Sequence, residues 1–265
     1  MTFSTFYCKI DFINTVGVDL PTKFLLFFNT VLLYLHTKSK LLKRLINIDS
    51  VSNYKIKINH KICEIKFRVQ DIPIFYEVML YGIYYLPYDW VPKGATVVDL
   101  GAHIGCTSVY FLQNYHIETY LAVEPSPENF SVLQQNATSF SIETVNKAIY
   151  INNGKVKLDS SSQRGQNHHL VEVTGTEVEA VSMDSLMKEY NINTIDVLKI
   201  DIEGTENILF KNKPEWLKMV RVILIELHGD YTVSELKNDI SPYGFEIVPK
   251  DNPFGIKMIC AHRMQ

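Results

Sequence analysis

Acidic side chains and one histidine stand at the ends of the short apolar runs that the sequence predicts as core strands. These residues are Asp99, Glu124, Asp201, Glu226 and His228. In an open α/β sheet the carboxyl ends of the strands border the ligand crevice, so we expect these side chains to converge on one edge of the sheet. Carboxylates and an imidazole in such a crevice can bind hydroxyl groups or accept a proton from a substrate.

A glycine turn follows Asp99. Residues 97–100 form an apolar run too short for a helix, and Gly101 and Gly105 separate it from a periodic segment. This pattern is typical of a buried parallel strand that turns into a helix, where backbone N–H groups can approach a ligand. The glycines lack the Gly-x-Gly-x-x-Gly spacing for a pyrophosphate, and no Gly-Lys-Ser/Thr follows for a triphosphate. A nucleoside without phosphates fits the turn better, and S-adenosylmethionine is such a ligand.

Two of the acids have a specific expected use. Glu124 stands 23 residues after Gly101, at the end of the second predicted strand. An acid there accepts hydrogen bonds from both ribose hydroxyls and repels a 2′-phosphate, and the alternative is an acid that caps the helix after Pro125. Asp99 is expected to be nearly buried, so it should be paired or hydrogen-bonded to the glycine-loop amides or to a ligand amine. The alternative for Asp99 is a purely structural clamp of the loop.

The elements that must position these residues alternate between strand and helix. The predicted strands are one that begins at Val97 and those at 120–124, 143–149, 195–201, 221–228, 245–248 and 256–261. The predicted helices are 106–114, 127–136 with Ser126 as its N-cap, 183–190 and 233–239. Two further β segments, 155–159 and 171–173, flank a polar loop at 160–169. Strands that alternate with helices of about 10 residues predict βαβ units and a mainly parallel sheet.

An N-terminal extension, residues 1–72, precedes this pattern and is expected to serve as a cap or an oligomer contact. Alternating apolar residues over 54–69 predict a β-hairpin within it. The apolar segment 24–35 is shorter than the roughly 20 residues that a transmembrane helix needs. We expect it to pack on the domain or on a second subunit, as in a homodimer. Because basic residues follow it, weak contact of residues 24–44 with an anionic membrane surface is the alternative.

Composition narrows the class of protein. The 265 residues are 46% apolar and 21% charged, with a formal net charge of −3, which is typical of a soluble globular protein and gives no electrostatic argument for nucleic-acid binding. Four widely spaced cysteines form no Cys-x-x-Cys motif, which predicts free thiols and a reducing, cytoplasmic location. The pair His168-His169 has no further ligand spacing, so no metal site is expected.

Four blocks of sequence resemble one known family. They are Val98-Asp-Leu-Gly-Ala-His-Ile-Gly105, Glu124-Pro-Ser-Pro-Glu-Asn129 with Leu133 and Asn136, Asp196-Val-Leu-Lys-Ile-Asp-Ile-Glu-Gly-Thr-Glu206, and Ile225-Glu-Leu-His228. In order and spacing they look like the FkbM family of S-adenosylmethionine-dependent methyltransferases. The resemblance implies that residues 73–265 form a class I methyltransferase domain, a Rossmann-like α/β fold with a seven-stranded, mainly parallel sheet and helices on both faces. It departs at His103, where the family often has Asn.

The resemblance also implies roles for individual residues. Those implied to hold S-adenosylmethionine, and its product S-adenosylhomocysteine, are Asp99, Gly101, Ala102, His103 and Gly105 by the methionine part, Glu124 and Pro125 by the ribose, and Ala148 by the adenine. Asp201, which is also expected to border the cofactor, Glu203 and His228 are implied to face the acceptor. The implied activity is O-methylation of a small molecule or a glycan.

Methyl transfer is an in-line displacement at a sulfonium methyl, so most of the catalysis should come from alignment. A carboxylate acceptor needs little acid or base help, whereas a hydroxyl acceptor must lose its proton as the new bond forms. His228 has the most suitable intrinsic pKa for that step, with Asp201 or Glu203 orienting it or acting directly. The alternative is a structural histidine at a strand end. Lys199 is expected to pair with Asp196 or another acid.

Two other functions use the same pattern. A nicotinamide-dependent oxidoreductase could be built on this sheet, although the pyrophosphate glycines it needs are missing. A non-catalytic scaffold that keeps the cofactor pocket is the third hypothesis. The acceptor itself is not encoded in the motifs, because its pocket is expected from residues 160–169, residues 75–85 and a second subunit.

Overall fold

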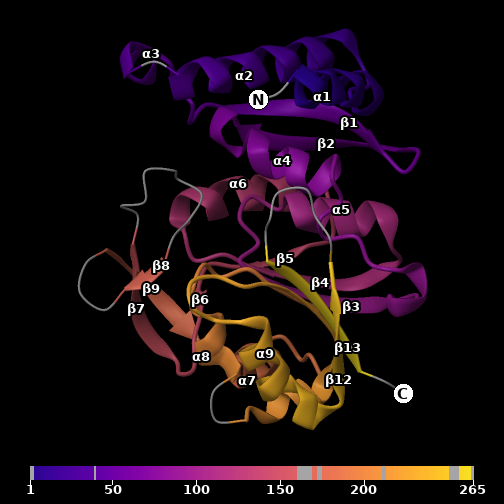
Figure 1. Ribbon diagram of the computed structural model, residues 1–265, viewed down its shortest axis with the longest axis vertical. Coiled ribbons are helices and arrows are strands. Elements are labelled where there is room, and N and C mark those ends of the chain that lie inside the picture. The colour runs from indigo at the N-terminus through magenta and orange to yellow at the C-terminus, as the bar shows by residue number, and fades with distance from the viewer. Residues whose placement is uncertain are drawn as a thin grey trace.

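A seven-stranded sheet forms the centre of the computed structural model (Figure 1), which describes residues 3–38, 40–159, 169–171, 175–210, 213–250 and 257–263. The strand order is β12-β13-β11-β10-β3-β4-β5, and all strands are parallel except β13. Their bounds are β3 Ala95–Leu100, β4 Ile117–Val123, β5 Glu143–Val145, β10 Ile195–Ile200, β11 Val220–Glu226, β12 Phe245–Pro249 and β13 Met258–Arg263. The predicted α/β fold with a seven-stranded, mainly parallel sheet is therefore confirmed.

The two central strands explain why the strand-end residues meet. Buried residues occupy nearly every position of β3 and β10 because helices cover both faces of the sheet, so neither face of these strands is exposed to water. The parallel register pairs Val98 with Leu198 and Asp99 with Lys199. Both strands thus end at the same level, and the turn that follows each one opens on the same edge.

Helices form the outer layers (Figure 1). On one face lie α4 Ile72–Met79, α5 Cys106–Asn114 and α6 Pro127–Ala137, and on the other lie α7 Met183–Glu189, α8 Glu206–Phe210 and α9 Val233–Ile240. The predicted N-cap is confirmed, since the Ser126 side chain accepts a hydrogen bond from the Asn129 N–H at the start of α6. Four short 3-10 segments, η1 Val69–Asp71, η2 Tyr88–Trp90, η3 Glu215–Met219 and η4 Ser241–Tyr243, complete the connections among the described residues.

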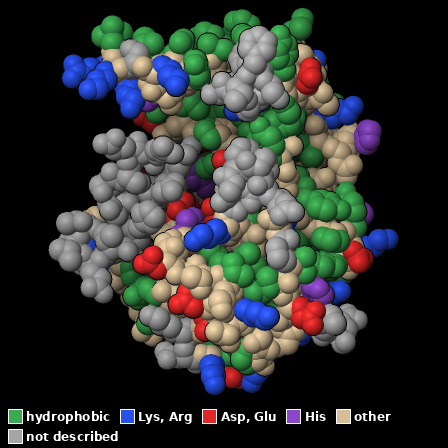
Figure 2. Space-filling model, in the orientation of Figure 1, with side chains coloured by type: hydrophobic (Ala, Val, Ile, Leu, Met, Phe, Trp, Pro, Cys, Tyr) green, Lys and Arg blue, Asp and Glu red, His purple; other side chains and the backbone are tan. Residues whose placement is uncertain are grey.

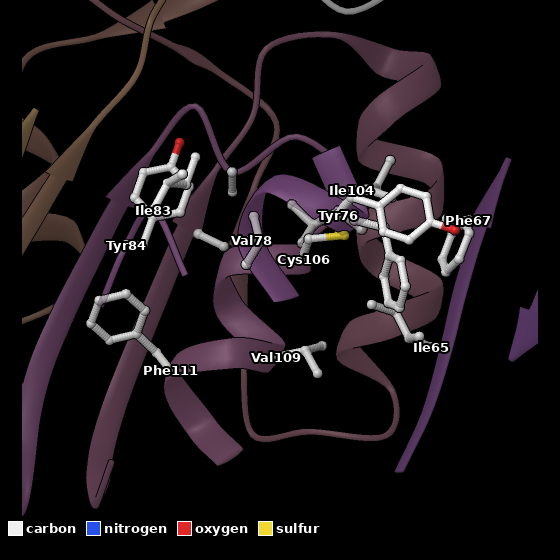
Figure 3. Packing of buried hydrophobic residues seen from close by; sticks show 14 of the residues in the cluster. Ile65, Phe67, Tyr76, Val78, Ile83, Tyr84, Ile104, Cys106, Val109 and Phe111 are labelled. Atoms are coloured by element: carbon white, nitrogen blue, oxygen red, sulfur yellow. The ribbon is translucent and has the colours of Figure 1, made fainter. Parts of the chain in front are cut away.

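The N-terminal extension packs on the α4–α6 layer. It consists of α1 Phe3–Val16, α2 Leu20–Lys38, α3 Lys40–Leu45 and the predicted hairpin, β1 Val51–Ile58 with β2 Lys61–Arg68. The Tyr54 and Phe67 rings stack across the hairpin with centroids 3.9 Å apart, and Phe67 lies 4.8 Å from Phe75 of α4. Figure 3 shows the same apolar cluster continuing to Tyr84 and Phe111. The hairpin therefore shares a core with the sheet, and a domain boundary at residue 72 stays a prediction.

The apolar segment 24–35 lies within α2. Asn29 and Thr30, which interrupt the segment in sequence, face inward, where Asn29 Nδ2 donates to the Tyr54 hydroxyl at 2.7 Å and the Thr30 hydroxyl lies 2.7 Å from that of Tyr76. The opposite side of α2 is apolar and exposed, and Figure 2 shows hydrophobic side chains over these N-terminal helices. Of the helices in the described ranges, none has the length and apolar character to cross a bilayer. Contact of residues 24–44 with lipid or a second subunit stays a prediction.

A smaller sheet corrects one expectation. The single strand predicted over 143–149 is wrong, because the chain divides it between β5 in the large sheet and β6 in a four-stranded sheet. Between them Asn146 Nδ2 donates to the carbonyl oxygens of Glu124 and Pro125, which turns the chain away from β4. The order of the small sheet is β6-β9-β7-β8, with β6 Ala148–Ile149, β7 Gly154–Asp159, β8 His169–Val171 and β9 Thr176–Val181. Residues 172, 173 and 256 of the predicted strands lie outside the described ranges.

Asn136 of α6 joins the hairpin to the glycine loop. Its side chain is buried, donates to the carbonyl oxygens of Lys66 (2.9 Å) and Ile104 (2.7 Å), and accepts from the Lys66 N–H (2.7 Å). Asn136→Ala leaves three backbone groups without this partner, so we expect the free energy of unfolding to fall by about 2–3 kcal/mol in urea denaturation. The exposed residue Gln134 of the same helix provides the control, since Gln134→Ala should change this free energy by less than about 0.5 kcal/mol, and equal values for the two variants would contradict this assignment.

Candidate active site

The glycine loop turns the chain between β3 and α5. The N–H groups of Gly101 and Ala102 both donate to the Val123 carbonyl, at 2.9 and 3.0 Å, which ties the loop to the end of β4. Gly101 has a φ of +79°, and a Cβ at this position would lie 1.8 Å from the carbonyl oxygen of Asp201. The close approach of β3 to β10 at this edge of the sheet therefore requires glycine at this position.

A cavity of about 390 Å³ opens at the carboxyl ends of β3, β4, β10 and β11, a size typical of small-molecule sites. It brings together most of the predicted site residues, namely Gly101, Ala102, His103, Glu124, Pro125, Ala148, Asp201, Glu203 and His228. Of the predicted cofactor residues, Asp99 and Gly105 lie behind its lining. The convergence expected from the sequence is thus present, and the roles of the individual residues stay predictions.

Glu124 lies almost wholly buried in the cavity wall. Its carboxylate accepts from the N–H of His103 at 2.8 Å, the N–H of Ser126 at 2.9 Å and the side chain of Asn129 at 3.4 Å. Burial raises the pKa of Glu124 to about 7 against these hydrogen bonds. A carboxylate offers about four acceptor positions, so this one has roughly one left for a ligand hydroxyl. Beside it, Val123, Ala148, Ile149 and Leu158 form an apolar wall.

Asp99 lies beneath the glycine loop and is fully buried. Its carboxylate is 3.1 Å from Lys199 Nζ and accepts from the Tyr120 hydroxyl at 2.9 Å. Lys199 also donates to the Gly101 carbonyl and stands 3.6 Å from Asp201. The expected pairing of Lys199 with an acid is confirmed with Asp99. The alternative partner Asp196 instead accepts from the Thr96 N–H. The pair gives Asp99 a structural contact that holds the loop against β10.

His103 projects from the glycine loop with a φ of +52°. Within the described chain neither of its ring nitrogens has a hydrogen-bond partner, and Nε2 is 3.9 Å from Asp71. Burial lowers the pKa of His103 to about 4, so the imidazole is neutral near pH 7. A neutral ring with an open donor and an open acceptor can hydrogen-bond a ligand in the cavity.

His228 stands just beyond β11 among carboxylates. Its Nδ1 donates to Glu206 at 2.9 Å, while its Nε2 lies 3.3 Å from Glu203, 3.4 Å from Glu226 and 3.8 Å from Asp201. Burial alone lowers the pKa of His228, but the hydrogen bonds to Glu206 and Glu226 and the neighbouring negative charges raise it to about 11. The sequence suggested Asp201 or Glu203 as the orienting group, and in the structure Glu206 orients the ring.

Glu206 acquires this position from a tight turn after β10. Its carboxylate accepts from the backbone N–H groups of Ile202 and Gly204, and the turn places Glu203 and Gly204 at φ values of +58° and +108°. Glu206 is also the first residue of α8, where an acid suits the helix dipole. The dipole accounts for an acid at this position, and only the fold shows that the same carboxylate reaches His228.

The helix α4 and the segment after it form a further wall of the cavity, although they lie outside the four sequence blocks that resemble the family. The Tyr84 hydroxyl donates to Asp201 at 2.9 Å, and Glu77 of α4 also lines the cavity. Burial, followed by the charges of Glu226 and Asp201, raises the pKa of Glu77 to about 7. Both residues belong to the segment 75–85, from which part of the acceptor pocket is expected. The expected wall at 160–169 lies outside the described residues except for His169.

Comparison with known proteins agrees with this arrangement. The model of the methyltransferase FkbM domain matches residues 99–246, more than half of the chain. The hexuronic acid methyltransferase AglP of Haloferax volcanii is 21% identical over 185 residues, covering 69% of this chain and 74% of that protein. Methyltransferase 1 of Beauveria bassiana is 23% identical over 177 residues, covering 54% of this chain and 70% of that protein.

Among solved structures, Aeropyrum pernix fibrillarin with bound S-adenosyl-L-methionine matches with a TM-score of 0.42 and 16% identity over 83% of this chain and 84% of that one.

The family match contains the glycine loop, Glu124 and the β10 and β11 strand ends that border the cavity. The chain therefore belongs to the FkbM family and is an S-adenosylmethionine-dependent methyltransferase.

Proposed function

We propose that the protein methylates a hydroxyl group of a glycan or a related small polar molecule. The observation that carries this proposal is the meeting of His228 with Asp201 and Glu203 in the same cavity that the glycine loop and Glu124 line. A hydroxyl of the acceptor can donate a hydrogen bond to these carboxylates. The similarity to a relative named as a hexuronic acid methyltransferase supports a sugar acceptor.

Other residues that line the cavity fit S-adenosylmethionine. The remaining acceptor position of Glu124 suits a ribose hydroxyl, the wall formed by Val123, Ala148, Ile149 and Leu158 suits a flat base, and the open ring nitrogens of His103 suit a polar group. When bound, this cofactor supplies an electrophilic methyl group on a good leaving group. Gly101 and Glu124 would hold it, and the chain's remaining task is to align and deprotonate the acceptor.

Asp201 and Glu203 take the hydroxyl proton, while His228, whose pKa is raised to about 11, contributes a positive charge beside them. Tyr84 and Lys199 hold Asp201 from two sides, and Glu206 fixes the ring of His228. Because Asp201 and His228 are each held by a partner outside the group, they face the acceptor without further rearrangement. Preorganised side chains of this kind lower the reorganisation needed as the proton leaves.

The pKa of Glu124 predicts how cofactor affinity depends on pH. A ribose hydroxyl donates to the ionised carboxylate, which with a raised pKa of about 7 is mostly protonated at pH 6 and mostly ionised at pH 8. Affinity for S-adenosylhomocysteine should therefore rise by up to about 10-fold from pH 6 to pH 8. Calorimetry on Glu124→Gln, which stays neutral, should show weaker and nearly pH-independent binding. An unchanged pH dependence in that variant would rule out Glu124 as its source.

Two measurements test the function itself. Calorimetric titration should show saturable binding of S-adenosylhomocysteine and none of NAD, and the opposite pattern would overturn the proposal. Incubation with labelled S-adenosylmethionine and a panel of glycans should then give a product heavier by one methyl group. A methyl ether survives alkaline hydrolysis and a methyl ester does not, so the product of this step distinguishes a hydroxyl acceptor from a carboxylate.

A further inference from the structure

The part of the cavity around Asp201, Glu203 and His228, which we call the acceptor end, has the geometry of a cation site. One ligand atom each from Asp201, Glu203 and His228 lie within 4.8 Å of one another, and Glu226 adds an oxygen 3.4 Å from His228 Nε2. Adjacent ligands of an octahedral ion with bonds of about 2.1 Å are about 3.0 Å apart, and opposite ligands are about 4.2 Å apart. The separations of 3.3, 3.4 and 3.8 Å between Nε2 and the three carboxylates fall in that interval.

The histidine is held as metal-binding histidines usually are. Its Nδ1 donates to the buried carboxylate of Glu206, which leaves Nε2 directed at the three oxygen ligands. A carboxylate on the far nitrogen of a ligating histidine fixes the ring and increases its basicity. Glu206 is itself anchored by two backbone N–H groups, so the position of Nε2 is determined by the fold.

The charges around the cavity favour a cation. Asp201, Glu203, Glu206 and Glu226 surround one imidazole, and Glu77 faces them from α4. Lys199 stands nearer to Asp99 than to Asp201, at 3.1 against 3.6 Å, so its charge is shared with a carboxylate below the cavity. Grouping several partly buried carboxylates is costly, and the one positive charge of His228 offsets only part of that cost.

We propose that Asp201, Glu203 and His228, with Glu226 beside them, bind a divalent cation of the Mg²⁺ and Mn²⁺ class at the acceptor end of the cavity. Carboxylate-rich donor sets suit these ions, and the one imidazole is tolerated by Mn²⁺. The cation would bind the oxygen atoms of the acceptor and make its hydroxyl more acidic, while a carboxylate of the group takes the proton. This role rests on the proposed function, whereas binding of the cation can be measured without it.

Mn²⁺ titration followed by electron paramagnetic resonance tests the site on the full chain. We expect saturable binding that Mg²⁺ competes away. The variants Glu203→Gln and His228→Ala should bind Mn²⁺ at least about 10–100-fold more weakly, and Glu206→Gln, which weakens the support of the His228 ring and of the turn that carries Glu203, about 10-fold more weakly. Glu177→Gln and His116→Ala replace an exposed carboxylate and an exposed imidazole, so they should bind as the unaltered protein does.

Absence of a saturable signal up to about 1 mM Mn²⁺ would overturn the proposal, and so would unchanged affinity in both Glu203→Gln and His228→Ala. Binding of Zn²⁺ without Mn²⁺ would contradict the assigned class of ion. Circular dichroism and S-adenosylhomocysteine binding of each variant show whether it is folded. If the protein binds Mn²⁺ but not S-adenosylhomocysteine, the cation site is supported and the proposed function is rejected. If it binds S-adenosylhomocysteine but not Mn²⁺, the cation site is rejected and the proposed function is not.

Discussion

Replacing His228 with alanine should lower the turnover of methyl transfer by about 10²–10⁴-fold, the range associated with a positioned group that handles a proton. The ring lies among Asp201, Glu203 and Glu226, and of the imidazoles in the described chain it is the one with a nitrogen within 4 Å of these carboxylates. Its removal takes away a positive charge beside these carboxylates. It also removes the hydrogen bond that Nδ1 donates to Glu206. The acceptor then loses its proton without a preorganised partner.

The same variant should bind S-adenosylhomocysteine nearly as well as the unaltered protein, because the hydrogen bonds that hold Glu124 and the glycine loop do not involve His228. Single-turnover rates and calorimetry on the same preparations separate the two effects. His116→Ala, which removes an exposed histidine, provides the matched control and should have full turnover. A turnover of His228→Ala within about threefold of the unaltered protein would exclude the assigned role.

Gly101→Ala should unfold the protein or lower its free energy of unfolding by more than about 4 kcal/mol. The new methyl group would lie 1.8 Å from the Asp201 carbonyl oxygen, so β3 and β10 would have to separate at the centre of the sheet. Neither strand can move without disturbing the buried pair of Asp99 and Lys199, which links them. The free energy of unfolding therefore falls for two reasons, the steric clash with Asp201 and the left-handed backbone conformation that alanine would have to adopt.

Gly229→Ala separates these two costs. Gly229 also has a positive φ, +60°, but an added Cβ would meet no atom within 4 Å. Its replacement should cost only the roughly 1–2 kcal/mol of a left-handed alanine. Thermal and urea denaturation of both variants gives the comparison, and equal losses of stability would show that the close approach to Asp201 is not the reason for glycine at position 101.

Local sequence patterns predicted the centre of the fold well. The strands that became β3, β4, β10 and β11 are apolar runs with a charged residue at or just after the end, and such a pattern depends only on burial from both faces. Their alternation with helices determined a parallel sheet, and a parallel sheet places its strand ends together. The meeting of Glu124, Asp201 and His228 in one cavity followed from those two facts.

The remaining features depend on contacts between distant residues. The division of 143–149 follows from hydrogen bonds of Asn146 to Glu124 and Pro125, which no local pattern records. Glu206 reaches His228 across a turn whose shape depends on two residues with positive φ. Asn29 and Thr30 interrupt an apolar helix in sequence, yet they pair with tyrosines of the hairpin and of α4.

The wall formed by α4 and the segment after it lies outside the region that the family model matches. Glu77 and Tyr84 reach the cavity from before residue 99, whereas the glycine loop after Gly101 and Glu124 lie within the match. The features that define the family therefore do not determine this wall, which depends on the sequence of this chain at residues 72–86. A fragment trimmed to the matched residues would lose the Tyr84 hydroxyl that holds Asp201, together with most of β3 and all of β13.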